Sequence, residues 1–241
     1  MSGTPDVSIV LPVYNQADHI EHIAQSYFKA LDSLKHSAEI LLVVNASRDG
    51  SLERCRKLEQ EHDSVRVLQN DLPGWGRAVR TGLAEARGDT ICYTNSARTD
   101  AYTLALHVMV AVTNPALVIK ANRRLRHPFM RRMGSVLYNV ECRTLFDLPV
   151  WDVNGTPKVF SREVCRQLDL QEDGDLIDLE FILRCKQMGF QILEVPIVSA
   201  VRHGGESTTN YYSAVKMYWG AFKMLHTVKQ PAGSGRGNGN S

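Results

Sequence analysis

The sequence lacks the long apolar runs that mark membrane-spanning helices. Its longest such stretch, residues 104–119, is interrupted by Asn114-Pro115 and falls short of the roughly 20 apolar residues that cross a bilayer. Its first residues also lack the basic region and apolar core of a signal peptide, and strand character begins at Val7. We therefore expect a cytoplasmic protein that is either soluble or peripheral at a membrane.

Cysteine pairs and a strong net charge are absent as well. The five cysteines are an odd number and include no Cys-x-x-Cys pair, which argues against a disulfide framework or zinc site and favours a reducing compartment. The formal net charge is only +2, so the whole molecule has no electrostatic signature of a nucleic-acid-binding protein. We expect no nucleic acid among its partners.

Short apolar strands alternate with helical patterns along the first hundred residues. This alternation predicts a doubly wound α/β fold with a mostly parallel sheet, flanking helices and right-handed crossovers. We predict one domain over residues 1–230 and a flexible Gly/Ser/Asn-rich tail over 231–241. The expected strands are 7–12, 39–44, 65–69, 90–93 and 191–197, with 150–160 extended around a turn, and the expected helices are 18–35, 52–62, 77–86, 131–146 and 176–188, with Gly88 and Gly189 ending two of them.

Polar residues follow three of these strands. The strand at 90–93 turns polar at Thr94 and ends in Asp100, which is placed to cap a helix beginning at Ala101. Tyr14-Asn15 and Asn45 follow two other strands. Because the carboxyl ends of parallel strands meet at one edge, where open α/β sheets bind ligands, we expect one crevice of a size that suits a nucleotide.

Seven motifs in register resemble those of a known family over residues 7–208. The chain is similar to family 2 glycosyltransferases of the GT-A fold, and most similar to their dolichol-phosphate or polyprenyl-phosphate mannosyltransferase branch. The motifs are Pro12-Val-Tyr-Asn15, Val43-Val-Asn-Ala-Ser-Arg-Asp-Gly-Ser51, Gly74-Trp-Gly-Arg-Ala-Val-Arg-Thr-Gly82, Ala86-Arg-Gly-Asp89, Asp152-Val-Asn-Gly-Thr-Pro-Lys-Val-Phe160, Glu194-Val-Pro196 and Arg202-His-Gly-Gly-Glu-Ser207.

The resemblance implies a glycosyltransferase with a nucleotide-sugar-like donor and a polyprenyl-phosphate or small-molecule acceptor. Asp178 is the preferred catalytic residue, with Asp152 as a second candidate. The implied donor contacts are Pro12, Tyr14, Asn15, Gln16, Asn45, Ser47, Gly76, Arg77, Asn95 and Ala97, and the implied acceptor or phosphate contacts are Lys158, Arg123, Arg131, Arg202 and Ser207.

Four positions depart from the family pattern by losing a carboxylate. Gln16, Asn45 and Asn95 stand where members usually have Glu, Asp and Asp, and Ala97 replaces a second metal-binding Asp. Amides keep the shape and hydrogen-bonding reach of a carboxylate but not its charge, and Mg²⁺ prefers carboxylate oxygens. We therefore expect a divalent metal, Mg²⁺ or Mn²⁺, to bind weakly or not at all.

Two functional interpretations stay open at this point. In the favoured one, transfer is retained and arginines offset the charge of the diphosphate; the candidates are Arg77, Arg98, Arg123 and Arg202. In the other, the GT-A fold is kept but classical transfer is lost, which leaves a nucleotide-binding scaffold or a biosynthetic enzyme with a soluble acceptor.

Several local patterns also have a structural explanation. Gly74 and Gly76 suit either a phosphate contact or a simple turn before a helix. Residues 152–158 suit either a ligand-presenting turn or a hairpin. Asp178 and Glu180 fit the start of any helix, and a catalytic base is needed only if the acceptor is a hydroxyl or an amine.

The basic residues between 120 and 132 have no acidic neighbours, since residues 101–140 contain no Asp or Glu. The run 123–132 is either a solvated cluster or a site for an anionic phosphate or membrane headgroup. Residues 211–225 mix aromatic, apolar and lysine residues, as an interfacial, core or homodimer helix would.

Overall fold

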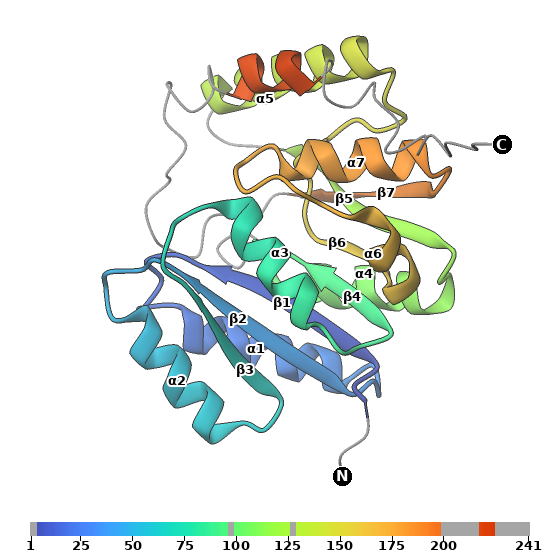
Figure 1. The fold of residues 1–241 in the computed structure, drawn as a ribbon. Coiled ribbons are helices and arrows are strands. Elements are labelled where there is room, and N and C mark those ends of the chain that lie inside the picture. Colours follow the sequence, from blue (N-terminus) through green and yellow to red (C-terminus); the bar gives the residue numbers. More distant parts are fainter. Residues whose placement is uncertain (1–3, 96–98, 126–128, 199–216, 225–241) are drawn as a thin grey trace, which may run out of the picture.

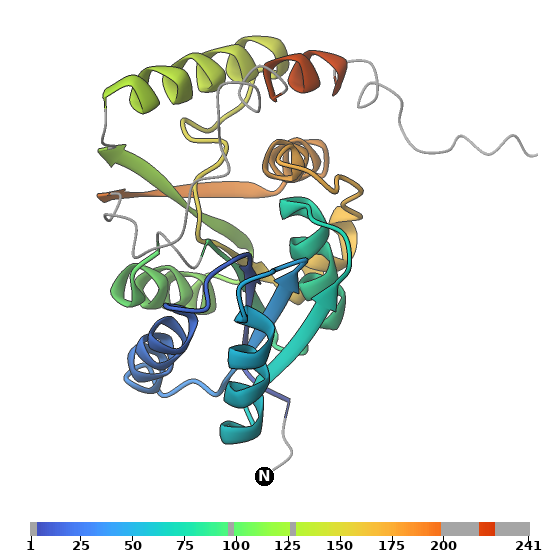
Figure 2. The same ribbon diagram turned by 90° about the vertical axis from the view of Figure 1, so that its left-hand side faces the viewer.

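A computed structural model describes residues 4–95, 99–125, 129–198 and 217–224. The chain forms one seven-stranded sheet in the order β3-β2-β1-β4-β6-β5-β7, with helices on both faces (Figures 1 and 2). The strands are β1 Val7–Val13, β2 Ala38–Asn45, β3 Val65–Asn70, β4 Thr90–Tyr93, β5 Leu117–Leu125, β6 Lys158–Ser161 and β7 Gln191–Val198. The helices are α1 Ile20–Asp32, α2 Ser51–Glu61, α3 Trp75–Glu85, α4 Ala101–Thr113, α5 Phe129–Phe146, α6 Arg162–Leu168 and α7 Ile177–Gln187, with a further helix over residues 217–224.

The apolar runs of β1 and β2 are buried because helices cover both faces of the sheet. Val10 belongs to the core beneath α3 and α7, whereas its neighbours Ile9 and Leu11 belong to the core beneath α1, α2 and α4. This alternation follows from the two-residue period of a strand. Burial on both faces explains why the sequence of these strands is continuously apolar.

The parallel strands β1, β2 and β4 bring their polar carboxyl ends to one edge. Val13 pairs with Val44, and Val10 pairs with Tyr93. Only β6 runs against its neighbours β4 and β5. The predicted α/β class, the mostly parallel sheet and the strand at 90–93 are confirmed.

Asp100 caps α4 as predicted, since its Oδ1 accepts the backbone N–H of Thr103 at 2.9 Å. The predicted role of Gly88 is wrong, because α3 already ends at Glu85. A Cβ on Gly88 would lie 2.5 Å from the backbone nitrogen of Ser8. Glycine is needed there for close packing against β1.

Two elements were not predicted, and one of the two interpretations left open for residues 152–158 is wrong. Strand β5 was missed because Lys120, Asn122 and Arg123 suggested an exposed segment, yet their side chains are largely buried. Helix α6 was also missed. The hairpin interpretation of residues 152–158 is wrong, because β6 pairs with β4 and β5, which are distant in sequence.

All five cysteines are free thiols, as the sequence suggested. Within residues 4–95, 99–125, 129–198 and 217–224, no helix has the length and apolar character needed to cross a bilayer. The tail predicted over 231–241 lies outside the described residues.

Candidate active site

The turns after β1 and β2 are joined into one unit at the carboxyl edge of the sheet. The backbone N–H of Asn15 donates to Ser47 Oγ at 3.1 Å, and the backbone N–H of Arg48 donates to Asn15 Oδ1 at 2.9 Å. Asn15 and Ala46 have φ values of 48° and 53°, in a region that asparagine enters more readily than most residues. Tyr14 is 40% exposed beside these turns, whereas Pro12 is buried inside β1.

Asn45 presents a buried hydrogen-bond acceptor at this edge. Its Nδ2 donates to the carbonyl oxygen of Gly74 at 3.0 Å, while its Oδ1 is buried without a partner in the described structure. A carboxylate in this place would face the Gly74 carbonyl with no proton to donate. The amide therefore has a structural reason. Its Oδ1 can accept an N–H from a bound ligand once neighbouring groups move aside, and such a bond would satisfy an acceptor that is costly to leave buried and unpaired.

Gln16 is buried beside the same turns, and its backbone N–H donates to Ser51 Oγ at 2.8 Å. Ser47 Oγ also donates to the carbonyl oxygen of Val13 at 3.3 Å. These protein contacts hold the two turns together. The donor-binding roles of Pro12, Tyr14, Asn15, Gln16, Asn45 and Ser47 stay predictions.

The loop after β4 offers neutral hydroxyl and amide groups. The hydroxyls of Thr94 and Thr99 form a hydrogen bond of 2.6 Å, and the backbone N–H of Thr99 donates to the Asn95 carbonyl oxygen at 3.1 Å. Asp100 uses both carboxylate oxygens on Thr103, at 2.9 and 2.6 Å. Ala97 and Arg98 lie outside the described residues.

These residues do not fit a divalent cation bound through protein carboxylates. Asn95 brings an amide, and the only nearby carboxylate of this loop, Asp100, serves as a helix cap. No group of three His, Cys, Asp or Glu side chains suited to a metal occurs in the described part of the chain. Hard cations prefer carboxylate oxygens, so no catalytic step is assigned to a metal here.

The turn before α3 is packed against protein where the sequence allowed a phosphate. A Cβ on Gly76 would lie 2.2 Å from the carbonyl oxygen of Glu172. Arg77 donates through Nη2 to Asp173 Oδ2 at 2.7 Å. The glycines are thus explained by close approach to residues 172–174, and Arg77 is committed to Asp173, so the geometry does not favour either Gly76 or Arg77 as a donor contact.

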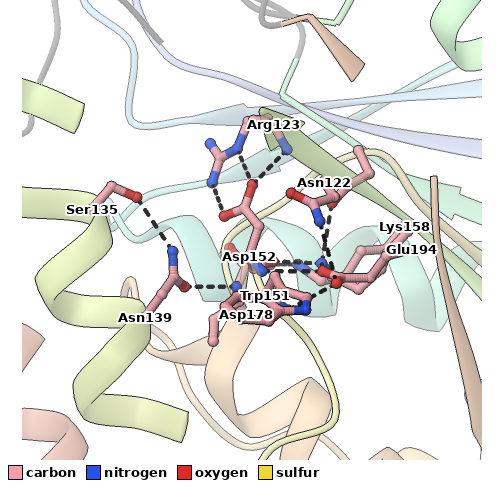
Figure 3. Close-up of polar contacts among 12 residues, drawn as sticks. Asn122, Arg123, Ser135, Asn139, Trp151, Asp152, Lys158, Asp178 and Glu194 are labelled. Atoms are coloured by element: carbon pink, nitrogen blue, oxygen red, sulfur yellow. Dashed lines mark hydrogen bonds and ion pairs between the residues drawn. The ribbon is translucent and has the colours of Figure 1, made fainter. Parts of the chain in front are cut away.

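A network of three cations and three carboxylates joins β5, β6, β7 and α7 to the turn before β6 (Figure 3). Arg123 makes a two-pronged pair with Asp152, with Nε–Oδ2 at 2.7 Å and Nη2–Oδ1 at 2.8 Å. Lys120 Nζ lies 2.8 Å from Glu194 Oε1, and Lys158 pairs with Asp178. The six formal charges cancel.

Burial and pairing determine the charge state of the cations in this network. Burial lowers the pKa of Lys158 below its usual value, although Asp178 opposes the shift. Burial also disfavours the charged form of Arg123, but its contacts with Asp152 outweigh that effect and raise its pKa. Burial lowers the pKa of Lys120 to about 8 against the attraction of Asp152 and Glu194.

The expected phosphate-binding residues are therefore not free surface cations. Lys158 is fully buried, and the Arg123 side chain is 17% exposed. The interpretation of residues 123–132 as one solvated cluster is wrong for Arg123, because it turns inward to Asp152. The side chains of Arg131, Arg202 and Ser207 lie outside the described part of the structure, and their acceptor roles stay predictions.

Asp178 has donors on both carboxylate oxygens. Its Oδ1 accepts the Tyr93 hydroxyl at 2.9 Å as well as Lys158, and its Oδ2 accepts Trp75 Nε1 at 3.2 Å. A general base needs an oxygen aimed at the proton it removes. Asp152 is similarly engaged with Arg123, so this arrangement fits a nucleophile that arrives already ionised.

The turn that carries Asp152 is pinned to β5 and β7. Glu194 accepts the backbone N–H of Trp151 at 2.8 Å and that of Asp152 at 3.1 Å. A Cβ on Gly155 would lie 1.9 Å from the Ala121 carbonyl oxygen. The motif at residues 152–158 therefore builds the wall of the site.

Sequence reasoning gave no role in the site to four residues that form or contact this network: Trp75, Tyr93, Lys120 and Glu194. Lys120 and Glu194 each interrupt an apolar strand. A lone charge in a buried strand indicates a paired partner elsewhere, and this signal could have found them. Nothing in the local sequence connects Trp75 or Tyr93 to Asp178.

Comparison with known proteins identifies the same family as the sequence motifs did. The model of the family described as "Glycosyl transferase family 2" matches residues 8–168. Glycosyltransferase AglD of Haloferax volcanii is 27% identical over 206 residues, which are 80% of this chain and 32% of the relative. Undecaprenyl-phosphate 4-deoxy-4-formamido-L-arabinose transferase of Salmonella choleraesuis is 36% identical over 87 residues, 35% of this chain and 27% of the relative.

Among solved structures, glucosyl-3-phosphoglycerate synthase of Mycobacterium tuberculosis, in complex with Mn²⁺, UDP and glucosyl-3-phosphoglycerate, aligns with a TM-score of 0.71 and 18% identity. The alignment covers 96% of this chain and 82% of that one. The same synthase has been solved with Mn²⁺, UDP-glucose and phosphoglyceric acid. This likeness establishes the GT-A fold. The chain spans about a third of the length of AglD and about a quarter of the arabinose transferase.

Proposed function

Because this chain belongs to glycosyl transferase family 2, we propose that it moves a sugar from a nucleotide-sugar donor to a phosphate-bearing acceptor. The observation that carries the donor assignment is the joined pair of turns after β1 and β2, where Asn45 presents a buried, unpaired Oδ1. A nucleobase N–H is a fitting partner for that oxygen. The crevice lies where open α/β sheets bind nucleotides.

The acceptor class follows from the state of Asp178 and Asp152. Both carboxylates are buried and held by donors, so neither is free to remove a proton from a hydroxyl. A phosphate oxygen is already anionic at neutral pH and needs no base. It would attack the anomeric carbon in line as the sugar's bond to the nucleoside diphosphate breaks, and the diphosphate would leave with the bonding electrons.

The substrates after which related proteins are named agree with an anionic acceptor. One relative is named for undecaprenyl phosphate, and the structural neighbour was solved with phosphoglyceric acid. The lipid acceptor is the better fit for this chain, because its named relatives in sequence include that transferase. A small soluble phosphate is the alternative.

Transfer should depend little on a protein-anchored metal. The support is the set of possible metal ligands in the loop after β4, where Asn95 stands in place of a carboxylate and Asp100 caps α4. Of the arginines expected to offset the diphosphate charge, Arg77 and Arg123 are paired with Asp173 and Asp152. Arg98 and Arg202, which lie outside the described residues, stay the candidates for that role.

A transfer assay tests this function. The purified protein is offered UDP- and GDP-sugars with undecaprenyl phosphate or phosphoglycerate as acceptor, in EDTA and in Mg²⁺. We expect sugar transfer to one phosphate acceptor. EDTA should lower the transfer rate by less than about tenfold, a factor that corresponds to about 1.4 kcal/mol of transition-state stabilisation. Nucleotide binding without transfer to any acceptor would instead favour the non-catalytic scaffold. Transfer that requires Mg²⁺ would contradict the metal proposal alone.

A lipid acceptor would require contact with a bilayer, and α5 has a surface that suits it. The α5 surface consists of the exposed side chains Met133, Val136, Leu137 and Val140, with Trp219 and Phe222 on the adjoining helix 217–224. Tyr218 joins that helix to α5 through a hydrogen bond of 2.8 Å to the Gly134 carbonyl oxygen. Apolar and aromatic residues beside Lys223, whose Nζ lies 6.0 Å from the Trp219 ring, are typical of membrane-interface helices.

Vesicle flotation distinguishes a bilayer from a second protein copy on the α5 surface. We expect the protein to float with anionic vesicles, and Leu137→Glu to abolish flotation. Leu106→Glu on α4 is the matched control, since Leu106 is 43% exposed and Leu137 is 57% exposed, and it should still float. Absence of flotation would contradict the proposed contact with a bilayer. A dimer in light scattering that Leu137→Glu dissociates would contradict it too, and would assign the α5 surface to a homodimer.

A further inference from the structure

We propose that Trp75 is a positioning residue that fixes Asp178 and links it to the nucleotide side of the site. This inference rests on the proposed transfer function for its catalytic consequence. Its structural part stands on contacts that are independent of that function. No motif of the family resemblance assigned a role to this side chain.

The first contact joins Trp75 to the charged network. Its indole Nε1 donates to Asp178 Oδ2 at 3.2 Å, across 103 residues of sequence. The other oxygen, Oδ1, is shared by Tyr93 and Lys158. An indole N–H is a donor only, so Trp75 is well matched to a carboxylate and supplies the hydrogen bond that stops Asp178 from rotating about its Oδ1 contacts.

The second contact joins the main chain beside Trp75 to the donor crevice. The Gly74 carbonyl oxygen accepts the side-chain amide of Asn45 at 3.0 Å. On the other side, the backbone N–H of Gly76 donates to the Gly174 carbonyl oxygen at 3.1 Å. Trp75 is thus held between a residue of the proposed nucleotide site and the loop that precedes α7, the helix that carries Asp178.

Close packing makes this link rigid. Cβ atoms on Gly74 and Gly76 would lie 2.5 Å from the Asp173 carbonyl oxygen and 2.2 Å from that of Glu172. Neither glycine has room for a side chain, and the backbone of the turn cannot move without moving the loop at 172–174. A movement of Asn45 when a nucleotide binds would therefore also displace Trp75 and Asp178.

The consequence for transfer is a fixed charge arrangement beside the acceptor. Asp178 is the carboxylate paired with Lys158, whose Nζ also lies 5.2 Å from the Tyr93 ring and 5.8 Å from the Phe181 ring. If Asp178 rotates, the electrostatic field of this buried ion pair at the reacting groups changes. Removal of the Trp75 N–H should slow the chemical step more than it weakens nucleotide binding.

Nuclear magnetic resonance can observe the link directly, because the chain has only three tryptophans. Each Trp→Phe variant assigns one indole N–H signal. Trp151 and Trp219 are 64% and 62% exposed, so their signals should lie near that of free indole and exchange rapidly with D₂O. The Trp75 signal should lie downfield, exchange slowly, and move upfield in Asp178→Asn; if the Trp75 signal resembles the exposed pair, the proposal fails.

Titration with UDP and GDP tests the nucleotide side. The nucleotide that binds should shift the Trp75 signal and leave those of Trp151 and Trp219 in place. Absence of a Trp75 shift despite measured nucleotide binding would overturn the link. Absence of binding by both nucleotides would count against the proposed function, while the Asp178→Asn spectrum still decides the structural contact.

Kinetics separate a positioning role from a merely structural one. For Trp75→Phe we expect kcat to fall about tenfold, the equivalent of losing about 1.4 kcal/mol from a hydrogen bond to a charged group, with the nucleotide Kd changed less than about twofold. The control Trp151→Phe should keep both values. Unchanged kcat, or a loss explained entirely by a smaller folded fraction in thermal unfolding, would overturn the positioning role.

Discussion

Replacement of Asp178 by Asn is expected to lower the free energy of unfolding by about 3–5 kcal/mol, the usual cost of breaking a buried ion pair. The side chain of Asp178 is 7% exposed, and that of its partner Lys158 is fully buried. Asn keeps the size of the side chain but leaves the lysine without a counter-charge. Urea unfolding at neutral pH measures the change.

Asp147→Asn is the matched control for this prediction. Asp147 also pairs with a lysine, Lys186, at 3.0 Å, but its side chain is fully solvent-exposed. Exposed pairs contribute about 0–1 kcal/mol, so this variant should stay close to the parent protein. Adding Lys158→Met to Asp178→Asn should recover stability, because the uncompensated buried charge is gone. Equal losses in Asp178→Asn and Asp147→Asn would contradict the buried network.

Gly155→Ala is expected to cost more than about 3 kcal/mol, beyond the usual range for overpacking. Its Cβ would lie 1.9 Å from the backbone oxygen of Ala121. A backbone atom of β5 cannot rotate away as a flexible side chain would. The turn at residues 151–157 would have to leave β5, which would also separate Asp152 from Arg123. Urea unfolding and proteolysis of this turn report the change.

Gly134→Ala provides the contrasting substitution. A Cβ on Gly134 meets no atom within 4 Å, and alanine favours a helix over glycine by about 1 kcal/mol. The variant should therefore be as stable as the parent protein or slightly more stable. If Gly155→Ala behaved in the same way, the close approach of the turn to β5 would be wrong.

Much of the fold could be predicted because local patterns agree with the tertiary structure. Four apolar strands alternate with helices in the first hundred residues, and burial on both faces of the sheet requires exactly such runs. The polar ends of β1, β2 and β4 also indicated the ligand edge. Topology then brings them together, since these three strands are parallel neighbours.

The pairings within the charged network could not be predicted, because the partners are far apart in sequence. Lys120 and Glu194 are separated by 74 residues, and Trp75 and Asp178 by 103. Arg123 was interpreted together with the basic residues after it, as part of either a solvated cluster or a phosphate site, so β5 and the inward pairing of Arg123 were missed. The pairing across β5, β7 and the 151–157 turn offsets the desolvation cost of burying these charges.

The amide at position 45 shows how structure changes the meaning of a substitution. From sequence, Asn45 was an implied donor contact that keeps the shape of an aspartate without its negative charge. In the structure its Nδ2 donates to the Gly74 carbonyl oxygen, a contact that a carboxylate cannot make. The same amide thus supports the turn before α3 and leaves Oδ1 as the acceptor proposed for the nucleobase.

Calorimetric titration of UDP and GDP in EDTA tests the central claim most directly, because it isolates nucleotide binding from the acceptor and from divalent ions. The account predicts that one nucleotide binds with one-to-one stoichiometry, that Mg²⁺ changes its Kd less than about tenfold, and that Asn45→Ala weakens it by about tenfold through loss of one hydrogen bond of about 1.4 kcal/mol. Binding of neither nucleotide under any condition, or an unchanged Kd in Asn45→Ala, would contradict a nucleotide site at Asn45.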